Sequence, residues 1–489
     1  MPQKRRFTKT AFVFFLITVT AMAALVSAPM VLANPSLLRQ SIIDYNLQSY
    51  DKSLPDGSYD GAAGVLLIGP EVARSFGLKA FLDENYSEAR ELNAKADLLF
   101  GKAVSAITTQ EQERFAGEHS KTAGDLALAS KDARRLARKH FLAYRLKVTP
   151  EIDDRLDRSA CSELLDKLLK ESLTKASFNL RDGLGIFYNR CQGLPENSPS
   201  LSPDNVRFVN HVFYEFTQKA SDADKKPFDL GKQERSRGTN PGSSWKNIVK
   251  SEDPLFLPLV EQCLDRQNKA GYPVDPLLFI ALMRRESNFD PRAVSYVGAA
   301  GLTQIMPATG KGLGMKNIYM PSYFQEAISL MGHERRLRQK AIALISEITE
   351  KNRVGNGELA RELMQKSSNL GRKRSQLFGR YKKELLEKNR DDRLNPGKAI
   401  EYGYKYFSEL MKMQKGDISL ALSCYNAGPH RVKQYKGVPP YAETVTFRNI
   451  VLKYYQEYLM KLKIEEAAKR HKNWHIVKST SSGLPLSRE

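Results

Sequence analysis

Apolar residues recur three and four positions apart along most of this 489-residue chain, for example over 81–107 and 125–144. This spacing is typical of helices that bury one face. Pro150 and Asp153 are good starting residues for a further helix, because both suit a first helical turn. A chain of this length usually holds more than one compact core. We therefore predict an all-α fold built from at least two folding units.

Composition divides the chain into segments. Residues 34–220 have helical patterning and no residues that indicate catalysis, so we expect an α-helical accessory domain there. Residues 221–254 hold few large apolar side chains and a cluster of Gly, Pro and Ser, which indicates a linker. A second domain is expected over 255–462, followed by a polar tail over 463–489.

Residues 1–33 have the layout of an export signal. An apolar run over 11–28 follows a basic start and precedes a small-residue site at 31–33. Residues 1–33 are therefore predicted to be a signal peptide or, because the apolar run is at the edge of the length that spans a bilayer, an uncleaved membrane anchor. No Cys follows the run, so no lipoprotein signal is expected. We expect an exported protein of the periplasm or cell envelope, with membrane tethering as the alternative.

The charge balance narrows the class of partner. The chain has 76 Lys plus Arg against 55 Asp plus Glu, a formal net charge of +21. Such a surplus favours an anionic partner, namely nucleic acid, acidic lipid or an acidic polymer. An exported protein is a poor candidate for nucleic-acid binding. A nucleic-acid-binding role would require that the N-terminus not act as an export signal. An anionic polymer outside the cytoplasm is the better match.

Four cysteines occur in the chain, Cys161, Cys191, Cys263 and Cys424. An exported chain can form disulfides, and Cys161 with Cys191 is the first pair to test because both lie in one helical segment. The alternative is four small buried side chains. No CxxC or Cys/His spacing indicates a metal site, so no metal and no cofactor are expected.

One helix is well defined by its flanking residues. Asp275 is a good N-cap and Pro276 a good first helical residue, since the N–H that proline lacks is not needed at that position. Pro291 blocks continuation, so the helix is expected to end near Asn288.

A carboxylate continues the apolar stripe of that helix. Leu278, Leu282 and Glu286 are spaced four apart, which places them on one face. Burial disfavours the charged form and raises the pKa of a carboxyl group, as a general acid working near neutral pH requires. The alternative is that Glu286, close to the helix end, turns to solvent or pairs with Arg285.

Three further motifs follow in order. Residues 295–307 (SYVGAAGLTQIMP) hold two glycines three apart and a proline, which indicates a tightly packed turn. Residues 421–429 (ALSCYNAGP) read as a helix that ends in polar groups and a Gly-Pro stop. Residues 438–444 read VPPYAET.

Together these motifs resemble those of the soluble lytic transglycosylases, the family 23 glycoside hydrolases. The order is ES, then GLTQIMPATG, YNAGP and PPYxET, and the resemblance covers about 256–320 and 395–460. It implies a lysozyme-like, mostly helical catalytic domain with a glycan groove. It also implies peptidoglycan as the substrate, cut at the β-1,4 bond between N-acetylmuramic acid and N-acetylglucosamine with formation of a 1,6-anhydro sugar.

The resemblance assigns residues by position. Glu286 corresponds to the catalytic acid. The expected substrate-binding residues are Ser287, Ser295, Gln304, Met306, Tyr425, Asn426 and Glu443. The family usually continues the last glutamate as ETRxYV, whereas this chain continues with 445–448 as VTFR.

Only one well-placed carboxylate is found, although most glycosidases use two. A lone acid suffices if the substrate supplies the nucleophile. Glu286 would protonate the leaving oxygen and then deprotonate the C6 hydroxyl that attacks C1, with Tyr425 expected to hydrogen-bond Glu286. A muramidase of the same fold and a non-catalytic peptidoglycan-binding scaffold are the alternatives.

The segment 321–394 forms an insertion relative to the family pattern. Two helical arms, 327–353 and 358–390, are expected to form an antiparallel hairpin broken near 355–357. Over 331–394 there are 17 bases and 9 acids, so the net charge is 17 − 9 = +8. Peptidoglycan stems, a membrane surface or a protein partner would suit this charge. A solvated hairpin without a partner is the alternative.

Overall fold

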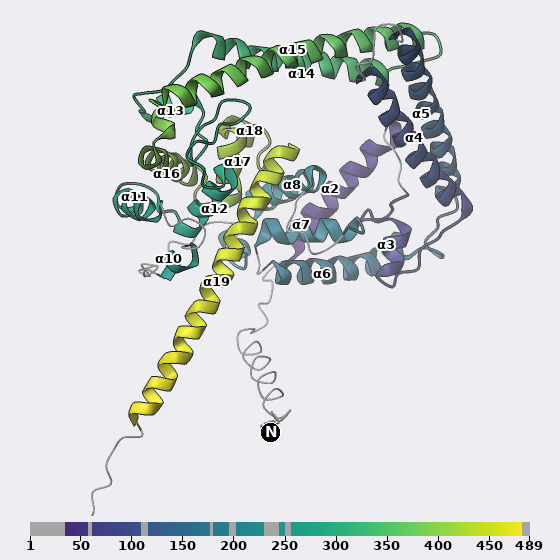
Figure 1. The fold of residues 1–489 in the computed structure, drawn as a ribbon. Coiled ribbons are helices and arrows are strands. Elements are labelled where there is room, and N and C mark those ends of the chain that lie inside the picture. The colour runs from purple at the N-terminus through teal and green to yellow at the C-terminus, as the bar shows by residue number, and fades with distance from the viewer. Residues whose placement is uncertain are drawn as a thin grey trace, which may run out of the picture.

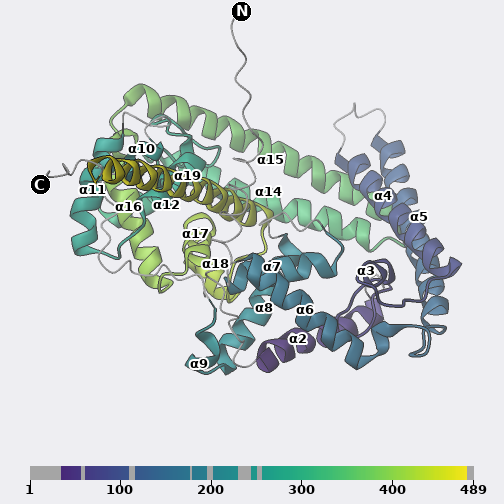
Figure 2. The ribbon, with the colours of Figure 1, turned by 90° about the horizontal axis from the view of Figure 1, so that it is seen from below.

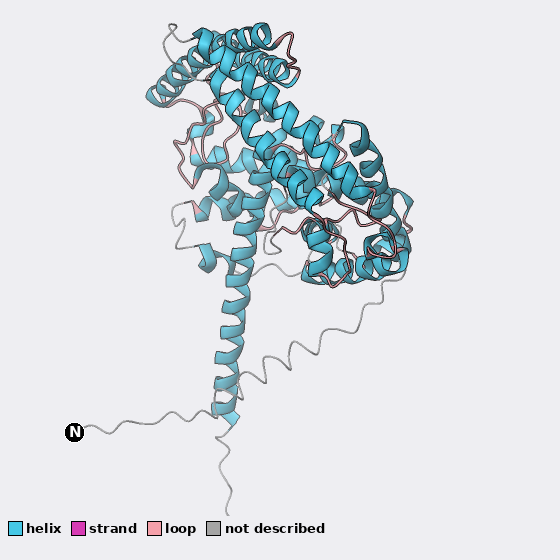
Figure 3. Cartoon of the chain, turned by 90° about the vertical axis from the view of Figure 1, so that its right-hand side faces the viewer, coloured by secondary structure: helices cyan, strands magenta, loops and turns pink. Residues whose placement is uncertain are grey.

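The computed structural model describes residues 35–56, 61–108, 116–176, 179–194, 202–228, 244–249 and 256–481 (Figure 1). Helices make up the regular structure of these residues, and no strand occurs among them (Figure 3). The predicted all-α class is therefore confirmed for the described ranges. None of the helices there is long and apolar enough to span a membrane. The predicted signal peptide or anchor at 1–33 lies outside the described residues.

Residues 35–219 form what we call the N-terminal unit. Its helices are α2 (Pro35–Asp56), α3 (Pro70–Ser75), α4 (Glu84–Thr108), α5 (Ala116–Arg145), η2 (Asp154–Leu156), α6 (Arg158–Lys175), α7 (Leu180–Cys191) and α8 (Pro203–Lys219). The helix expected near Pro150 and Asp153 begins later. Asp157 caps α6 by accepting hydrogen bonds from the backbone of the first turn, whereas Asp153 caps only the short η2.

Two short helices lie in the predicted linker, α9 (Asp222–Lys225) and α10 (Ser244–Val249). Helix α10 packs beside the last helix of the chain, and Trp245, Ile248 and Val249 are buried in the core of the second unit. Burial of three apolar side chains explains why these residues adopt ordered structure within a polar, glycine-rich stretch.

Residues 257–481 form what we call the C-terminal unit. Its helices are α11 (Leu257–Ala270), α12 (Pro276–Ser287), α13 (Pro307–Leu313), α14 (Ser322–Ser346), α15 (Arg353–Lys388), η3 (Asp392–Leu394), α16 (Pro396–Met413), α17 (Ile418–Ala427), α18 (Pro429–Gln434) and α19 (Ala442–Ser481). Helix α19 thus continues past residue 462, where the predicted domain ends.

Helix α12 occupies the centre of this unit. Every residue from Leu277 to Met283 is buried, and α11, α16, α17 and α19 contribute the surrounding side chains. The Asp275 side chain accepts hydrogen bonds from the N–H groups of Leu277 and Leu278, which confirms the predicted N-cap. Because α12 is buried on all sides along most of its length, only its C-terminal end is available to solvent.

The predicted insertion is a hairpin of α14 and α15, but the predicted break near 355–357 is wrong. The turn lies between Ser346 and Arg353, and Gly355 and Gly357 belong to α15. A Cβ atom at Gly357 would overlap the carbonyl oxygen of Ser120 on α5. The glycine therefore permits close helix packing, which sequence patterning alone read as a helix break.

The hairpin joins the two units at its far end, beside α4 and α5 (Figures 1 and 2). We call the apolar contact there the tip cluster. It consists of Ala103, Ile107, Ala123, Ala127, Ala341, Ile345, Ile348, Ala360 and Met364. Lys131 also donates a hydrogen bond to the carbonyl oxygen of Ile348 at 2.6 Å. The far end of the predicted insertion is thus covered by its own chain.

The units meet a second time near α7, α8 and α17. Arg181 lies 3.1 Å from Asp417, and Arg448 lies 2.7 Å from Asp182. Asn210 donates to the carbonyl oxygen of Val438 and accepts from its N–H, so its amide pairs with that residue as a neighbouring strand would. With the tip cluster, these contacts close the chain into the ring that Figure 1 shows.

All four cysteines are buried free thiols, so the disulfide considered between Cys161 and Cys191 is not formed. The two residues lie on separate helices, α6 and α7. Burial raises the pKa of the Cys161 thiol to about 11 and of the Cys191, Cys263 and Cys424 thiols to about 12. The thiols therefore act as small apolar side chains in the two cores.

Replacing Arg181 with Met should strongly destabilise the protein, because it leaves Asp417 buried without its cation. Breaking one partner of a buried ion pair typically costs about 3–5 kcal/mol. Urea unfolding followed by circular dichroism measures the loss. Arg207→Met is the matched control, since its pair with Asp204 is exposed and should contribute less than about 1 kcal/mol. Equal losses for the two variants would contradict the importance of the buried contact.

Candidate active site

The C-terminal end of α12 presents Glu286. The helix ends at Ser287, and Asn288 takes the left-handed conformation at a φ of 49°. The Ser287 hydroxyl lies 3.3 Å from the carbonyl oxygen of Met283 and 2.8 Å from that of Leu302. The second contact attaches the end of α12 to the turn that contains the GLTQIMP motif. Glu286 is thereby held between the buried core and the surface.

Glu286 lines a cavity of about 480 Å³. The cavity is bounded by the end of α12, by the segment 293–304 and by α19. Its lining residues are Arg284, Arg285, Glu286, Ser287, Asn288, Ala293, Val294, Ser295, Gln304, Ile450 and Tyr454. A space of this size, with one carboxylate at its wall and several polar groups around it, suits a small polar ligand or part of a polymer.

Burial raises the pKa of Glu286 to about 8. The positive charge of Arg285 acts in the opposite direction, and the negative charge of Glu443 raises the pKa further. The side chain is only partly exposed. Glu286 as a general acid stays a prediction, and the direction of its pKa shift agrees with that prediction.

The turn beside Glu286 is held by its own side chains. The Ser295 hydroxyl accepts a hydrogen bond from the N–H of Ala299 at 3.0 Å. The Gln304 amide donates to the carbonyl oxygens of Ala293 and Gly301 at 3.0 and 2.9 Å. Gln304 also has a φ of 46°, a conformation that costs free energy for a residue with a side chain and is often found at functional sites.

The remaining predicted substrate residues lie behind or beside the cavity. Met306 occupies the N-cap position of α13 without a side-chain capping bond and packs against the base of the α14–α15 hairpin. The Asn426 side chain accepts a hydrogen bond from the Thr444 hydroxyl at 2.8 Å. Glu443 is exposed and influences Glu286 through its charge. Of the eight predicted site residues, Glu286, Ser287, Ser295 and Gln304 line the cavity.

Tyr425 does not make the expected hydrogen bond to Glu286. Its hydroxyl donates to the carbonyl oxygen of Thr303 at 2.6 Å, which links α17 to the GLTQIMP turn. Burial, followed by the charge of Glu286, raises the pKa of Tyr425 well above its usual value. The tyrosine is therefore close enough to influence the carboxylate while its hydroxyl orients the turn.

Among the lining residues that sequence reasoning did not assign to the site, Ile450 and Tyr454 come from α19. They are spaced four apart, so they share a face of the helix. Arg284 lies with its guanidinium 4.0 Å from the Tyr454 ring centroid, which fixes both at the cavity wall. No motif in this segment marked either residue as part of a site.

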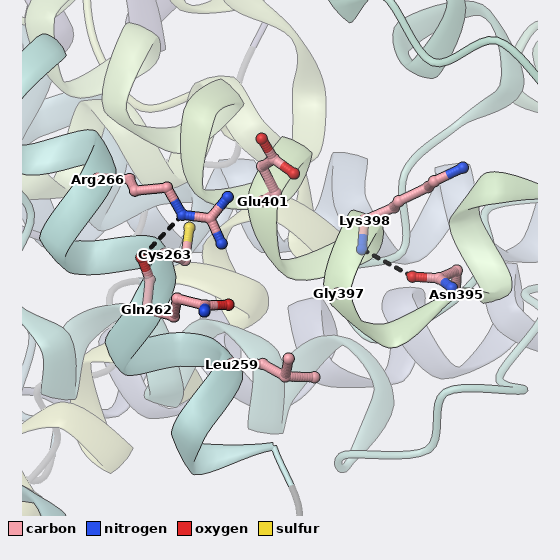
Figure 4. Close-up of a pocket in the computed structure, with 8 residues that line it drawn as sticks. All are labelled: Leu259, Gln262, Cys263, Arg266, Asn395, Gly397, Lys398 and Glu401. Carbon is pink, nitrogen blue, oxygen red and sulfur yellow. Dashed lines mark hydrogen bonds between the residues drawn. The ribbon is translucent and has the colours of Figure 1, made fainter.

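A second, smaller pocket of about 180 Å³ lies between α11 and α16 (Figure 4). Arg266 and Glu401 carry opposite charges on the two facing helices, and the Lys398 backbone N–H donates to Asn395. Lys398 directs its ammonium group to Asp392, at 2.7 Å. This pocket shares no lining residue with the Glu286 cavity and holds none of the predicted site residues.

Residues 264–330 and 350–444 match the family model described as the transglycosylase SLT domain. The similarity to this domain lies within two ranges of the C-terminal unit. The matched ranges include Glu286, the GLTQIMP turn, Tyr425 and Asn426, so the resemblance noted from the motifs is confirmed. The match leaves out residues 331–349, which lie in α14 and the hairpin turn.

Curated relatives match short segments of this chain. A transglycosylase of Enterobacteria phage PRD1 is 49% identical over 53 residues, which is 11% of this chain and 20% of the relative. The membrane-bound lytic murein transglycosylase C of Haemophilus influenzae is 39% identical over 63 residues, 13% of this chain and 16% of the relative. The chain thus matches a fifth or less of the length of these two proteins.

Two solved structures align with most of the chain at low identity and a low TM-score. The 70 kDa soluble lytic transglycosylase SLT70 of Escherichia coli covers 91% of this chain, with 74% of its own chain covered, at 13% identity and a TM-score of 0.25. An inactive mutant of the lytic transglycosylase Slt of Pseudomonas aeruginosa covers 92% of this chain, with 71% of its own chain covered, at 15% identity and a TM-score of 0.25.

Glu286→Gln should stabilise the protein at high pH and leave it unchanged at low pH. The pKa of Glu286 in the folded protein, about 8, exceeds its ordinary value of 4.5, so the folded state holds the proton more tightly than the unfolded state. The stability that this residue provides is therefore present below pH 4.5 and lost as the pH rises through 8. Glutamine stays neutral throughout.

Thermal unfolding at pH 4 and pH 9 measures this effect. We expect a higher midpoint for Glu286→Gln than for the wild type at pH 9 and equal midpoints at pH 4. Glu401→Gln, in the exposed wall of the second pocket, is the control and should follow the wild type at both values. A Glu286→Gln midpoint below the wild type at pH 9 would show that the carboxylate is charged and stabilised.

Proposed function

We propose that this protein is a peptidoglycan lytic transglycosylase that uses Glu286 as its single catalytic carboxylate. The observation that carries the proposal is the placement of Glu286, a carboxyl group with a pKa raised to about 8, in the wall of a cavity of about 480 Å³. The SLT domain match and the names of the relatives agree with this reaction class. The bond cut would be the β-1,4 bond between N-acetylmuramic acid and N-acetylglucosamine.

The chemistry follows from a carboxyl group that is protonated near neutral pH. Glu286 donates its proton to the glycosidic oxygen, the bond from that oxygen to C1 breaks, and the N-acetylglucosamine hydroxyl leaves. The muramic N-acetyl group shields the positive charge at C1. The Glu286 carboxylate then takes the proton of the C6 hydroxyl as its oxygen bonds to C1, which closes the 1,6-anhydro ring and restores the acid.

The surroundings of Glu286 support one carboxylate with two roles. Glu443, the nearest acidic influence, is exposed and outside the cavity lining, so it is poorly placed to be a nucleophile at the same sugar. Ser295 and Gln304 are held rigidly by backbone hydrogen bonds and line the same cavity. A fixed wall of polar groups suits the positioning of a sugar that must present its own C6 hydroxyl.

We further propose that the protein acts outside the cytoplasm, at the cell wall, on the basis of the signal-like pattern in residues 1–33. Exposed bases along the α14–α15 hairpin, such as Arg338, Lys340 and Lys382, lie between its base and its buried tip. These side chains provide positive charge for an anionic wall polymer or a membrane surface. No nucleic acid is involved in this proposal.

Digestion of purified peptidoglycan, with the products identified by mass spectrometry, tests the reaction. We expect 1,6-anhydromuramic ends from the wild type and a fall in rate of at least about 100-fold for Glu286→Gln, because general acid–base catalysis is lost. Glu401→Gln, a carboxylate in the other pocket, should keep wild-type activity. Reducing muramic ends would identify a muramidase, and tight binding without products would identify a scaffold.

The pH dependence of kcat/KM tests the state of the acid. Because catalysis begins with a protonated Glu286, kcat/KM should fall as the pH rises through about 8. Removing the charge of Glu443 should move this limb to lower pH, whereas Arg285→Met should move it to higher pH. Profiles of the wild type, Glu443→Gln and Arg285→Met measure both shifts. A limb that does not move in either variant would contradict the assignment to Glu286.

A further inference from the structure

Two short sequences occur in both units. Residues 61–70 (GAAGVLLIGP) and 298–307 (GAAGLTQIMP) share Gly, Ala, Ala, Gly, Ile and Pro at the same places. Residues 153–156 and 391–394 both read Asp-Asp-Arg-Leu. The offset in numbering is 298 − 61 = 237 for the first pair and 391 − 153 = 238 for the second. Two motifs in the same order at almost the same offset point to a common structural unit.

In the N-terminal unit the second motif supplies a fully buried arginine, Arg155. Its guanidinium donates to both carboxylate oxygens of Asp153 at 2.8 and 2.7 Å. It also donates to the carbonyl oxygens of Gly61 and Ile68 at 2.9 and 3.2 Å and to the Tyr144 hydroxyl at 2.6 Å. The arginine thus joins η2, the end of α5 and the GAAG turn.

In the C-terminal unit Arg393 makes the same contacts at nearly the same distances. It donates to both carboxylate oxygens of Asp391 at 2.9 and 2.8 Å. It also donates to the carbonyl oxygens of Gly298 and Ile305 at 2.9 and 3.2 Å and to the Tyr381 hydroxyl at 2.6 Å. A buried cation with five matched hydrogen bonds is too specific to arise twice from helix packing alone.

The tyrosines repeat as well. The Tyr144 hydroxyl donates to the carbonyl oxygen of Phe81 at 2.9 Å, and their rings stack at 5.9 Å and 13°. The Tyr381 hydroxyl donates to the carbonyl oxygen of Tyr319 at 3.1 Å, and their rings stack at 5.7 Å and 16°. The hairpins α4–α5 and α14–α15 are therefore attached to their units in the same way.

The two GAAG turns also share an unusual backbone. Gly64 and Gly301 have φ values of 71° and 79°, and a Cβ at either would overlap the carbonyl oxygen of the buried arginine of its unit. Three positions later, Leu67 and Gln304 have φ values of 51° and 46°. A leucine rarely adopts this conformation, so the backbone at Leu67 is strained. The same conformation occurs at Gln304 in the cavity wall, whereas Leu67 does not line that cavity.

We propose that the N-terminal unit is a second copy of the SLT unit that has lost its catalytic acid and serves as the built-in pairing partner of the active copy. Element order supports the equivalence. In order along the chain, α2 to α7 with η2 match α12 to α17 with η3, and α8 matches α19. The α14–α15 hairpin is then part of the repeated unit, with α4–α5 as its counterpart, so its presence needs no separate insertion event.

One hydrogen bond identifies the counterpart of the active-site helix end. The Asn46 amide donates to the carbonyl oxygen of Val65 at 2.9 Å, as the Ser287 hydroxyl does to that of Leu302 at 2.8 Å. Val65 and Leu302 are themselves equivalent, because they occupy the same place in the two GAAG sequences. Asn46 is therefore the structural equivalent of Ser287. The residue before it, Tyr45, is the equivalent of Glu286.

The counterparts of the site residues lack its chemistry. Tyr45 replaces Glu286, and its ring packs against Phe208 at a centroid distance of 5.2 Å. Leu67 replaces Gln304. Tyr425 lies eight positions after the N-cap of α17, and the residue eight positions after the N-cap of α7 is Phe187. The view that an active site was lost here rests on the proposed function of Glu286, whereas the equivalence of the units does not.

The tip cluster shows how the copies pair. Ala103 and Ile107 meet their own equivalents, Ala341 and Ile345, in one cluster. Ala123 and Ala127 likewise meet Ala360 and Met364. Equivalent faces contact each other in this way when two copies are related by an approximate twofold axis. A Cβ at Gly357 would overlap Ser120, its equivalent at the offset of the GAAG pair, which places that axis where α5 and α15 cross.

The N-terminal unit also contacts the segment that leads to Glu443. Asn210 on α8 bonds both the N–H and the carbonyl oxygen of Val438. The segment containing Val438 leads to Glu443, whose charge raises the pKa of Glu286. The N-terminal unit therefore helps to position the segment that carries Glu443, and it supplies no catalytic group to the site.

Distances between spin labels in the full-length protein test the pairing. Labels are placed on cysteines introduced at Lys121 and Lys351, which are exposed near the tip cluster, and the four native cysteines are buried. Ile107→Glu and Ile345→Glu should each broaden and lengthen the distance distribution to a similar extent, because each buries a carboxylate at an equivalent place. Leu98→Glu, exposed on α4, should leave it unchanged.

An effect of one isoleucine variant without the other, or of neither, would overturn the equivalent pairing. This result is independent of catalysis, so it stays interpretable if the proposed function fails. Calorimetric titration of Glu286→Gln with a tetrasaccharide of alternating N-acetylglucosamine and N-acetylmuramic acid tests the loss of the second site. We expect one site per chain, unaffected by Tyr45→Ala. A second site that Tyr45→Ala removes would overturn it.

Discussion

The rest of the C-terminal unit depends on the burial of one guanidinium group. Arg393 has no exposed surface, and its five hydrogen bonds reach η3, the end of α15 and the turn that carries Gln304. A buried charge is costly unless every donor finds an acceptor. Because the acceptors come from three separate segments, the network forms only when all three are correctly placed. The network therefore couples the position of the hairpin to that of the cavity wall.

The candidate site uses that rigidity to hold an unfavourable group. Glu286 follows a fully buried helix, and burial keeps its carboxyl group protonated near neutral pH. Tyr425 and Ser287 both bond carbonyl oxygens of the same turn, so helices α12 and α17 are fixed to it independently. A group that reduces stability at neutral pH and above is tolerated because its surroundings are held by contacts on several sides.

Sequence reasoning succeeded where a few adjacent residues determine the outcome. Asp275 and Pro276 set the start of α12, and the spacing of Leu278, Leu282 and Glu286 placed the carboxylate on the buried side. It failed where the deciding contact is distant. Gly357 was read as a break because its neighbour Ser120 belongs to the other unit, and Tyr425 was assigned to Glu286 because its true acceptor is a backbone oxygen. The repeat was missed because only two short motifs preserve it.

The four buried thiols can report on local unfolding of the protein. Thiolates, not thiols, react with alkylating and oxidising agents, and in the folded protein burial holds all four pKa values at about 11 or 12. Reaction must therefore wait for the surrounding core to unfold. Cys161 and Cys191 lie in one unit, and Cys263 and Cys424 in the other. The rate at which each pair of cysteines is modified therefore measures how often its own unit unfolds. No engineered probe is needed for this measurement.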